Sequence, residues 1–209
     1  MTNSPSDCEQ IERKRRTEQA FVISLEDVLT PYEVDYVNQK VAVYGEGKES
    51  GKIGEGKVVE EVRTSEIIWL KHTQNAWLYE KIWHAIKTSN DEYWQFDIMR
   101  ATPSHLGGTS MQYTEYYAND SGHYDWHLDV GQGQAWHRKL SWSIQMSDPR
   151  LYEGGDLRII GGSNKASYPA NTMKGSMTIF PSFLQHKVFP VTKGTRRSLV
   201  GWVYGPAWR

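Results

Sequence analysis

From about Tyr93 onward, the chain is a series of short β-prone segments with turn residues between them and no helical pattern. Strands are predicted at 93–100, 109–118, 124–130, 139–147, 155–161, 167–172, 176–181, 185–191 and 197–204. Parallel strands need long crossover connections, usually helices, so strands in such a series pair antiparallel. The sequence therefore predicts a mainly β fold, an antiparallel sandwich or barrel.

Two helices are predicted before this β-rich part. Thr30 can cap the first helix, Pro31 suits its first turn, and Glu33 completes a capping box. The second helix is predicted from about Asn75 to Lys87, where apolar residues recur at helical spacing. We therefore expect supporting helices over about 26–90 and a β core over about 93–206.

The chain has 209 residues, enough for one substantial core. Residues 1–19 are polar and predict a flexible tail, so a single domain is expected over 20–209. The glycine-rich and charged segment 45–57 is interpreted as a mobile lid or a surface loop.

Charge and composition exclude several classes of partner. The formal net charge is −1, so the chain lacks the excess of positive charge that binding to nucleic acid or an anionic membrane requires. The N-terminal segment lacks the apolar stretch of a signal peptide, and no run approaches the roughly 18 apolar residues of a membrane span. The single cysteine, Cys8, fits a reducing compartment. A cytoplasmic protein is expected, with neither nucleic acid nor membrane as a partner.

The segment 116–131 contains two His-x-Asp pairs, His123/Asp125 and His127/Asp129. Side chains at i and i+2 of a strand point the same way, so either pair could offer an imidazole and a carboxylate to one ion. Two histidines and one carboxylate on one face of an octahedron form the site of non-haem Fe(II) oxygenases.

A third ligand is expected from His186, because of the segment around it. An apolar strand leads to a Pro-Ser corner, His186 opens a second strand, and a Lys193-Gly194 turn precedes a strand that carries arginines. This pattern predicts a hairpin that places His186 near an arginine. Arg196 and Arg197 point to opposite faces of their strand, so only one of them can enter the barrel.

Four spaced motifs carry a family resemblance. The runs YDWHLD (124–129), YEGGDL (152–157), FPS (180–182) and HKVFPVTKGTRRSLVGW (186–202) resemble the prolyl-4-hydroxylase-like branch of the 2-oxoglutarate/Fe(II) oxygenases. The resemblance covers about residues 93–206. It implies a double-stranded β-helix (jelly-roll) fold, with His127, Asp129 and His186 as metal ligands.

The resemblance also implies the cosubstrates and the reaction. Its arginine stands six residues before Trp202, which selects Arg196 as the partner of the far carboxylate of 2-oxoglutarate. Fe(II), 2-oxoglutarate and O2 are the implied cofactor and cosubstrates, and ascorbate is a candidate addition. The implied enzyme is a dioxygenase (hydroxylase) that decarboxylates 2-oxoglutarate to succinate. Its implied substrate is a prolyl residue in a peptide or protein. The alternatives are a free amino acid or small metabolite, or a non-catalytic jelly-roll binding module.

Further residues are candidates for the walls of the site. Over 140–146 the polar Ser141, Ser143 and Gln145 share one face of the predicted strand. Gln145 stands near the place where relatives often have a tyrosine that contacts the cosubstrate. Tyr116 and Tyr124 are further cosubstrate candidates.

Three uncertainties in the site follow from strand phase and loop position. Tyr117 takes the place of Tyr116 as the candidate for contact with the cosubstrate if the alternation of the strand is shifted by one residue. His123, Asp125 and Trp202 are candidates for contact with substrate. So are the segments 45–57 and 131–138.

Overall fold

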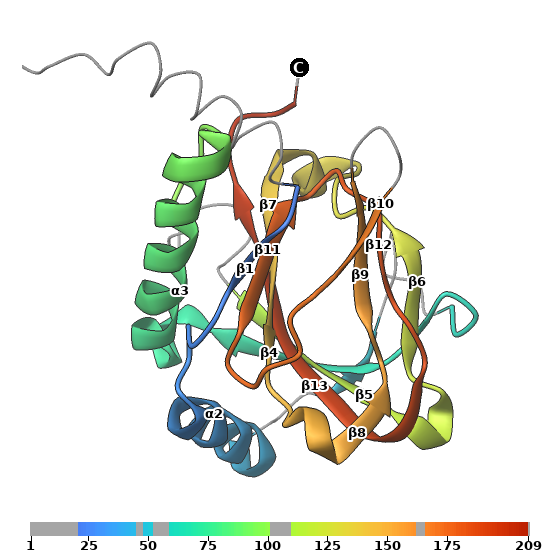
Figure 1. Ribbon diagram of the computed structural model, residues 1–209. Helices are drawn as coiled ribbons and strands as arrows, with labels where there is room; N and C mark the ends of the chain where they lie inside the picture. Colours follow the sequence, from blue (N-terminus) through green and yellow to red (C-terminus); the bar gives the residue numbers. More distant parts are fainter. Residues whose placement is uncertain (1–20, 45–47, 52–58, 101–109, 162–165, 209) are drawn as a thin grey trace, which may run out of the picture.

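The computed structural model describes residues 21–44, 48–51, 59–100, 110–161 and 166–208. The predicted tail and most of the segment 45–57 lie outside these ranges. Two antiparallel sheets face each other, and two helices cover the outer side of one of them (Figure 1). The prediction of a mainly β fold is confirmed.

The larger sheet consists of eight strands: β1 (Ile23–Leu25), β2 (Glu49–Ser50), β4 (Glu66–Lys71), β5 (Ser110–Tyr117), β7 (Arg138–Gln145), β8 (Tyr152–Gly154), β11 (Met177–Pro181) and β13 (Val191–Tyr204). Their order is β1-β11-β7-β13-β5-β4-β2, and β8 pairs with β13 beside this path. The long strand β13 thus lies near the middle of the sheet, between β7 and β5.

The smaller sheet consists of five strands: β3 (Arg63–Thr64), β6 (His123–His127), β9 (Leu157–Gly161), β10 (Ala166–Pro169) and β12 (His186–Val188). Their order is β10-β9-β12-β6-β3, so β12 is central. In Figure 1, β6, β9 and β12 stand opposite β7, β11 and β13. A space between the two sheets is therefore walled by strands from both.

Helices α2 (Pro31–Tyr44) and α3 (Ala76–Ser89) pack on the outer face of the larger sheet (Figure 1). A core cluster of side chains from α2, α3 and this sheet includes Leu78, Ile82, Leu140, Ile144 and Leu199. Short helical turns complete the described residues: His72–Gln74, Asn90–Trp94, Ala118–Asp120, Gly133–His137 and Pro149–Leu151. No helix among these residues is long and apolar enough to cross a membrane.

The predicted start of the first helix is confirmed in detail. The backbone N–H of Glu33 donates to Thr30 Oγ1 at 3.3 Å, and the backbone N–H of Thr30 donates to Glu33 Oε2 at 2.7 Å. This reciprocal pair satisfies two N–H groups that the first turn cannot bond within the helix.

The strand predicted at 93–100 is wrong. Residues Asn90–Trp94 continue α3 as a wider turn, and Gln95 then adopts the left-handed conformation with φ 54°. The Asn90 side chain donates to the carbonyl of Phe96 and accepts from its N–H, which fixes the chain as it leaves the helix. Only a bridge between Met99 and Tyr204 joins this segment to a strand.

The expected helical support over 26–90 also contains three strands that the sequence pattern did not indicate. β2 and β3 have two residues each, too few for a period-2 pattern to be visible. β4 contains the run Ile67-Ile68-Trp69, and a short apolar run does not separate strand from helix. β3 and β4 pair with strands of the β core, and β2 pairs with β4, so that all three extend the two sheets.

The hairpin predicted between His186 and the arginine strand is wrong as well. β12 pairs with β6 and β9 of the smaller sheet, whereas β13 pairs with β5, β7 and β8 of the larger sheet. The chain crosses between the sheets at Phe189-Pro190, where proline has no N–H for a ladder. Lys193 and Gly194 lie inside β13, opposite β8.

The polar face predicted for 140–146 is confirmed. Trp142, Ile144 and Met146 belong to the core under the helices. Ser141 and Ser143 instead line a cavity between the two sheets. Beside it, a second apolar cluster that includes Leu157, Ile159, Phe180 and Val188 packs between the sheets. The larger sheet therefore has a dry face toward the helices and a polar face toward the cavity.

Candidate metal centre

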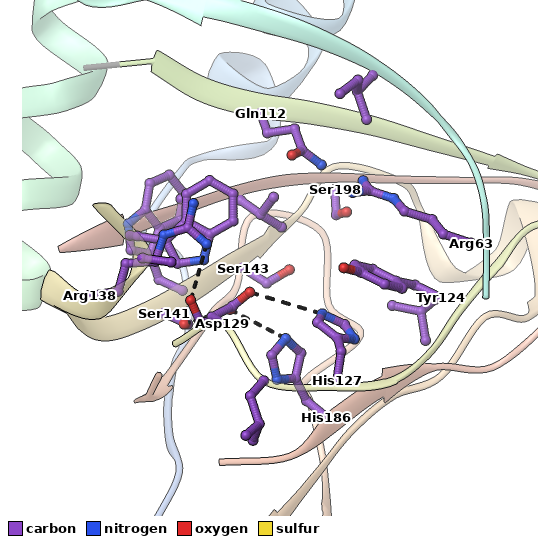
Figure 2. Close-up of a pocket in the computed structure, with 18 of the residues that line it drawn as sticks. Arg63, Gln112, Tyr124, His127, Asp129, Arg138, Ser141, Ser143, His186 and Ser198 are labelled. Carbon is purple, nitrogen blue, oxygen red and sulfur yellow. Dashed lines mark hydrogen bonds and ion pairs between the residues drawn. The ribbon is translucent and has the colours of Figure 1, made fainter. Parts of the chain in front are cut away.

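His127 and His186 come together through strand pairing. They are direct partners in the antiparallel pair of β6 and β12, and their ring centroids lie 4.0 Å apart. Asp129 follows two residues after β6, and its backbone N–H donates to the carbonyl of Ser182 at 3.1 Å. Figure 2 shows the three side chains converging on one point. Residues far apart in sequence are thus joined by one cross-strand pair.

The donor atoms of these residues fit a metal ion. One ligand atom from each of His127, Asp129 and His186 lies within 4.8 Å of the others. Asp129 Oδ2 is 3.3 Å from His186 Nε2, and Asp129 Oδ1 is 4.0 Å from His127 Nε2. Among the described residues, this is the group of histidine and carboxylate ligands that could hold a metal. Two imidazoles and one carboxylate match the ligand set of non-haem iron.

Backbone carbonyls orient both imidazoles. His127 Nδ1 lies 2.7 Å from the carbonyl of Asp125, and His186 Nδ1 lies 3.1 Å from that of Leu184. A carbonyl only accepts, so each Nδ1 carries a proton, and Nε2 is the nitrogen of each ring that is left to bind a metal.

The electrostatics of the three groups favour metal binding. Burial, aided by the nearby His186, lowers the pKa of His127 to about 3, so its imidazole stays neutral. Burial alone would raise the pKa of Asp129, but the charge and hydrogen bond of His186 outweigh it, and the pKa is lowered. Burial likewise opposes protonation of His186, and Asp129 outweighs it and raises its pKa. The site therefore offers an ionised carboxylate and a neutral His127, and a divalent cation would displace the proton that Asp129 favours on His186.

Ser141 supports the carboxylate from β7. Its hydroxyl donates to Asp129 Oδ2 at 2.6 Å and lies 2.9 Å from Ser182 Oγ. The guanidinium of Arg138 donates to the backbone carbonyl of Asp129 at 3.2 Å. Both contacts fix Asp129 from outside the ligand set.

We expect Ser141→Ala to weaken binding of a divalent metal by about tenfold, because outer-shell partners of metal ligands typically contribute 10–100-fold to affinity. Titration of the metal-free protein with Co(II), followed by its visible absorption, measures this. Ser143→Ala is the matched control, since Ser143 lies on the same face of β7, whereas Ser141 is the residue of that face that bonds the Asp129 carboxylate. Equal Co(II) affinity in Ser141→Ala and the wild type would contradict the role of Ser141.

Arg196 lies in the same cavity, on β13. Its side chain is 4% exposed, and its Nη1 is buried without a hydrogen-bond partner among the described residues. Gly155, at φ +69°, packs against it, and a Cβ at this position would lie 2.8 Å from Arg196 Cδ. An unpaired guanidinium nitrogen is costly to bury, so this geometry calls for an anion.

The cavity that contains both groups has a volume of about 950 Å³, within the range of ligand pockets. Its lining residues include Arg63, Gln112, Tyr116, Tyr124, Ser143, Trp202 and Ser198 beside the three candidate ligands and Arg196. The rim includes Leu128, Gly131, Gln132, Gly133 and Ala135, so part of the segment predicted at 131–138 borders the opening. From the segment 45–57, Glu49 lines the cavity.

The strand phase on β5 is as predicted. Tyr116 is in register with Arg196 and lines the cavity, with the Arg196 Cζ 5.6 Å from its ring centroid. Tyr117 points to the other face, where its hydroxyl contacts Lys48 and Glu115. Arg197 also faces that side and bonds Glu115 at 2.8 Å. Arg196 and Tyr116 thus face the cavity.

The other predicted contacts divide into two groups. Tyr124 and Trp202 line the cavity. Burial raises the pKa of Tyr124 to about 12, which keeps its phenol protonated. Gln145 does not line it, because its amide donates to the Tyr152 hydroxyl at 2.8 Å at the far end of β7.

His123 and Asp125 also lie away from the cavity lining. The ring of His123 contacts the backbone carbonyls of Ser121 and Glu61. Asp125 pairs with Lys187 at 2.8 Å, and Lys187 and the backbone N–H of Trp126 lower its pKa. The structure therefore joins His127 and Asp129 to His186 in the candidate metal centre, and His123 and Asp125 do not belong to it.

Two cavity arginines were not singled out by the sequence, although Arg138 ends the candidate segment 131–138. Arg138 lies over Trp202 with its Cζ 3.7 Å from the ring centroid, and its Nε is buried without a partner among the described residues. Arg63 comes from β3, a strand too short to predict. Neither residue belongs to a motif, and only strand pairing reveals where they lie.

Comparison with known proteins agrees with this geometry. Residues 111–204 match the family model described as the 2OG-Fe(II) oxygenase superfamily. A PKHD-type hydroxylase of Synechococcus sp. is 39% identical over 82 residues, which are 39% of this chain and 36% of that protein. A PKHD-type hydroxylase of Gloeothece citriformis is 35% identical over 96 residues, 45% of this chain and 42% of that protein. The chain thus spans less than half the length of these relatives.

Solved structures share the fold over nearly the whole chain. A prolyl hydroxylase from Trichoplax adhaerens, in complex with a peptide fragment of a hypoxia inducible factor, has a TM-score of 0.74 at 15% identity. The match covers 97% of this chain and 94% of that one. A Pseudomonas putida prolyl-4-hydroxylase has a TM-score of 0.69 at 17% identity, covering 94% and 98%. The expected jelly-roll fold is thereby confirmed.

The comparison with solved structures concerns the fold, whereas the comparison with sequences concerns the kinship of the segment that carries the site. At such low identity the solved structures establish only the fold. The family model and the curated relatives establish the sequence kinship of the segment that carries the site. The resemblance of this chain to the prolyl-4-hydroxylase-like branch is confirmed, and its residues 111–204 are similar to the 2OG-Fe(II) oxygenase superfamily.

Proposed function

We propose that this chain is an Fe(II)- and 2-oxoglutarate-dependent dioxygenase that hydroxylates a prolyl residue in a peptide or protein. Its metal would be held by His127, Asp129 and His186, and the far carboxylate of 2-oxoglutarate by Arg196. The observation that carries the proposal is the buried Nη1 of Arg196, which lies in the cavity of the ligand triad and has no hydrogen-bond partner in the part of the chain that the structure describes. A cosubstrate with a chelating end and a distant carboxylate satisfies both.

The metal and 2-oxoglutarate, when bound, supply the oxidising chemistry that inserts one oxygen atom of O2 into a C–H bond and yields succinate and carbon dioxide. The chain's own residues bind and orient. The two imidazoles and the carboxylate would hold the metal, and they match the ligand set of non-haem iron. Arg196 provides a rigid pair of donors that matches a carboxylate.

The cavity also controls polarity around the site. Ser141, Ser143, Ser198 and Gln112 give hydrogen-bonding groups on the larger sheet. Leu157 and Val188 of the smaller sheet and Phe180 of the larger sheet give an apolar wall. The phenol of Tyr124 is protonated and can donate a hydrogen bond. Trp202 adds an apolar surface at the side of Arg138.

The kinship with PKHD-type hydroxylases and the fold shared with prolyl hydroxylases support a prolyl substrate. A free amino acid or small metabolite is the second candidate, because the cavity volume of about 950 Å³ suits either a residue or a small molecule.

Turnover separates these candidates. The protein is incubated with Fe(II), 2-oxoglutarate and O2, together with ascorbate, and succinate is measured with and without proline-containing peptides or free amino acids. Succinate that rises with a peptide, and mass spectrometry that finds one added oxygen on its proline, would support the proposal. Stimulation by free amino acids alone would favour the second candidate. No succinate with any substrate, despite bound metal, would favour a non-catalytic module.

A further inference from the structure

Tyr124 lies between an arginine and a candidate metal ligand (Figure 2). Its ring stacks on the ring of His127, with centroids 3.5 Å apart and planes inclined by 14°. The Cζ of Arg63 lies 4.6 Å from the Tyr124 centroid. The three groups form a stack of guanidinium, phenol and imidazole, which we call the Arg63 stack.

An irregularity in the pairing of β6 with β12 allows the rings of Tyr124 and His127 to stack. Tyr124 and His127 are three residues apart, so regular alternation would put them on opposite faces of β6. However, His127 opposes His186 and Tyr124 opposes Val188, so three steps on β6 match two steps on β12. This extra residue is a β-bulge, which re-aims side chains locally. The bulge brings Tyr124 and His127 to the same side.

Arg63 is held firmly in its place. It is 6% exposed and is the register partner of Tyr124 in the pair of β3 and β6. Its Nε donates to Ser65 Oγ at 2.8 Å. Gly51 packs against it so closely that a Cβ there would lie 2.4 Å from Arg63 Nε. The position of the guanidinium is therefore set by β3 and by its neighbours, not by the flexibility of a surface side chain.

The Arg63 stack restrains the His127 imidazole in addition to its hydrogen bond with the Asp125 carbonyl. The contact from Nδ1 to the Asp125 carbonyl fixes one edge of the imidazole, but the ring can still tilt about that contact. Stacking on Tyr124 restricts the tilt. A cation over the other face of the phenol ring is attracted by its π-electrons and holds that ring in turn.

We propose that Arg63 is a positioning residue for His127, acting through Tyr124 to fix the imidazole plane for metal binding. The inference rests on the proposed metal site but not on turnover. The effect of Arg63 on the imidazole plane would appear as metal affinity. Outer-shell residues of this kind typically change affinity by 10–100-fold.

The test measures Co(II) affinity of the metal-free protein without 2-oxoglutarate, from the visible absorption of bound Co(II). Arg63→Gln should weaken Co(II) binding about tenfold, and Arg63→Lys, which keeps a cation, should recover part of it. The matched control is Arg158→Gln, because Arg158 of the smaller sheet lies over the ring of Phe189 at 5.8 Å, away from the site. The control should bind Co(II) like the wild type.

A second set of variants shows whether Arg63 acts through Tyr124. Tyr124→Phe keeps the ring and should keep Co(II) affinity, whereas Tyr124→Leu removes the ring and should lose it. Arg63→Gln added to Tyr124→Leu should cause no further loss, because residues that act through one another are not additive. The absorption spectrum of bound Co(II) should also change in Arg63→Gln, since it reports ligand geometry.

Thermal unfolding of each metal-free variant separates positioning from folding. Wild-type Co(II) affinity in Arg63→Gln, or additive losses in the double variant, would overturn the inference. Succinate formation by the wild type with unchanged affinity in Arg63→Gln would leave the proposed function standing. If Arg63→Gln binds Co(II) more weakly but the wild type forms no succinate, the positioning role of Arg63 would be supported and the proposed dioxygenase function would be contradicted. A wild type that binds no divalent metal would overturn both.

Discussion

Asp129→Ala should lose binding of Fe(II) or Co(II) by on the order of a thousandfold or more, beyond the 10–100-fold of an outer-shell partner. Asp129 is the carboxylate of the triad and lies 3.3 Å from His186 Nε2. Without it, two neutral imidazoles remain, and they supply neither the charge nor the third donor that a divalent cation needs in this site. Metal titration measures the loss, and succinate formation should fall with it.

Asp125→Ala is the matched control for this prediction. The sequence offers two His-x-Asp pairs, and Asp125 belongs to the other one. Its carboxylate pairs with Lys187 at 2.8 Å and does not line the cavity. We expect Asp125→Ala to bind metal like the wild type. A loss of metal in Asp125→Ala, with binding retained in Asp129→Ala, would show that the first pair holds the ion.

Arg196→Gln should weaken 2-oxoglutarate binding about 100-fold, because leaving a buried charge without its partner costs about 3 kcal/mol or more. The effect should be confined to the cosubstrate, since Arg196 is not part of the group of candidate metal ligands among the described residues. Isothermal titration of the anaerobic Co(II)-loaded protein with 2-oxoglutarate measures the affinity. Co(II) binding itself should not change.

Arg197→Gln is the control for the neighbouring position. Arg197 lies on the same strand but faces the opposite side, where it bonds Glu115 at 2.8 Å. Its loss should lower stability by weakening the cluster of Glu115, Lys48 and Tyr117, and leave 2-oxoglutarate affinity unchanged. Stronger loss of 2-oxoglutarate affinity in Arg197→Gln than in Arg196→Gln would show that the strand faces are reversed.

The sequence predicted those parts of the site that depend on alternation and on motif spacing. The alternation of β13 separates Arg196 from Arg197, and the same rule on β5 separates Tyr116 from Tyr117. The helix cap at Thr30 and Glu33 was visible because its chemistry is local. These features need only neighbours within a few residues, so a single sequence contains them.

Features that depend on pairing between distant strands were not visible. The hairpin expected after His186 failed because Pro190 ends pairing and the chain crosses to the other sheet. The bulge that aligns Tyr124 with His127 arises only from the register of β6 against β12. Arg63 reaches the site from a two-residue strand, for which no pattern exists. Partner choice, not local propensity, decides each of these.

The most direct test of the shared cavity is anaerobic titration of the metal-free protein with Fe(II) and then with 2-oxoglutarate. Chelation of the metal by the keto-acid end should give a weak visible charge-transfer absorption that saturates at one 2-oxoglutarate per chain. Arg196→Gln should shift this saturation to much higher 2-oxoglutarate concentration, and Asp129→Ala should abolish the absorption. An absorption that never appears in the wild type, or that saturates identically in Arg196→Gln, would contradict a single cavity that joins the triad to Arg196.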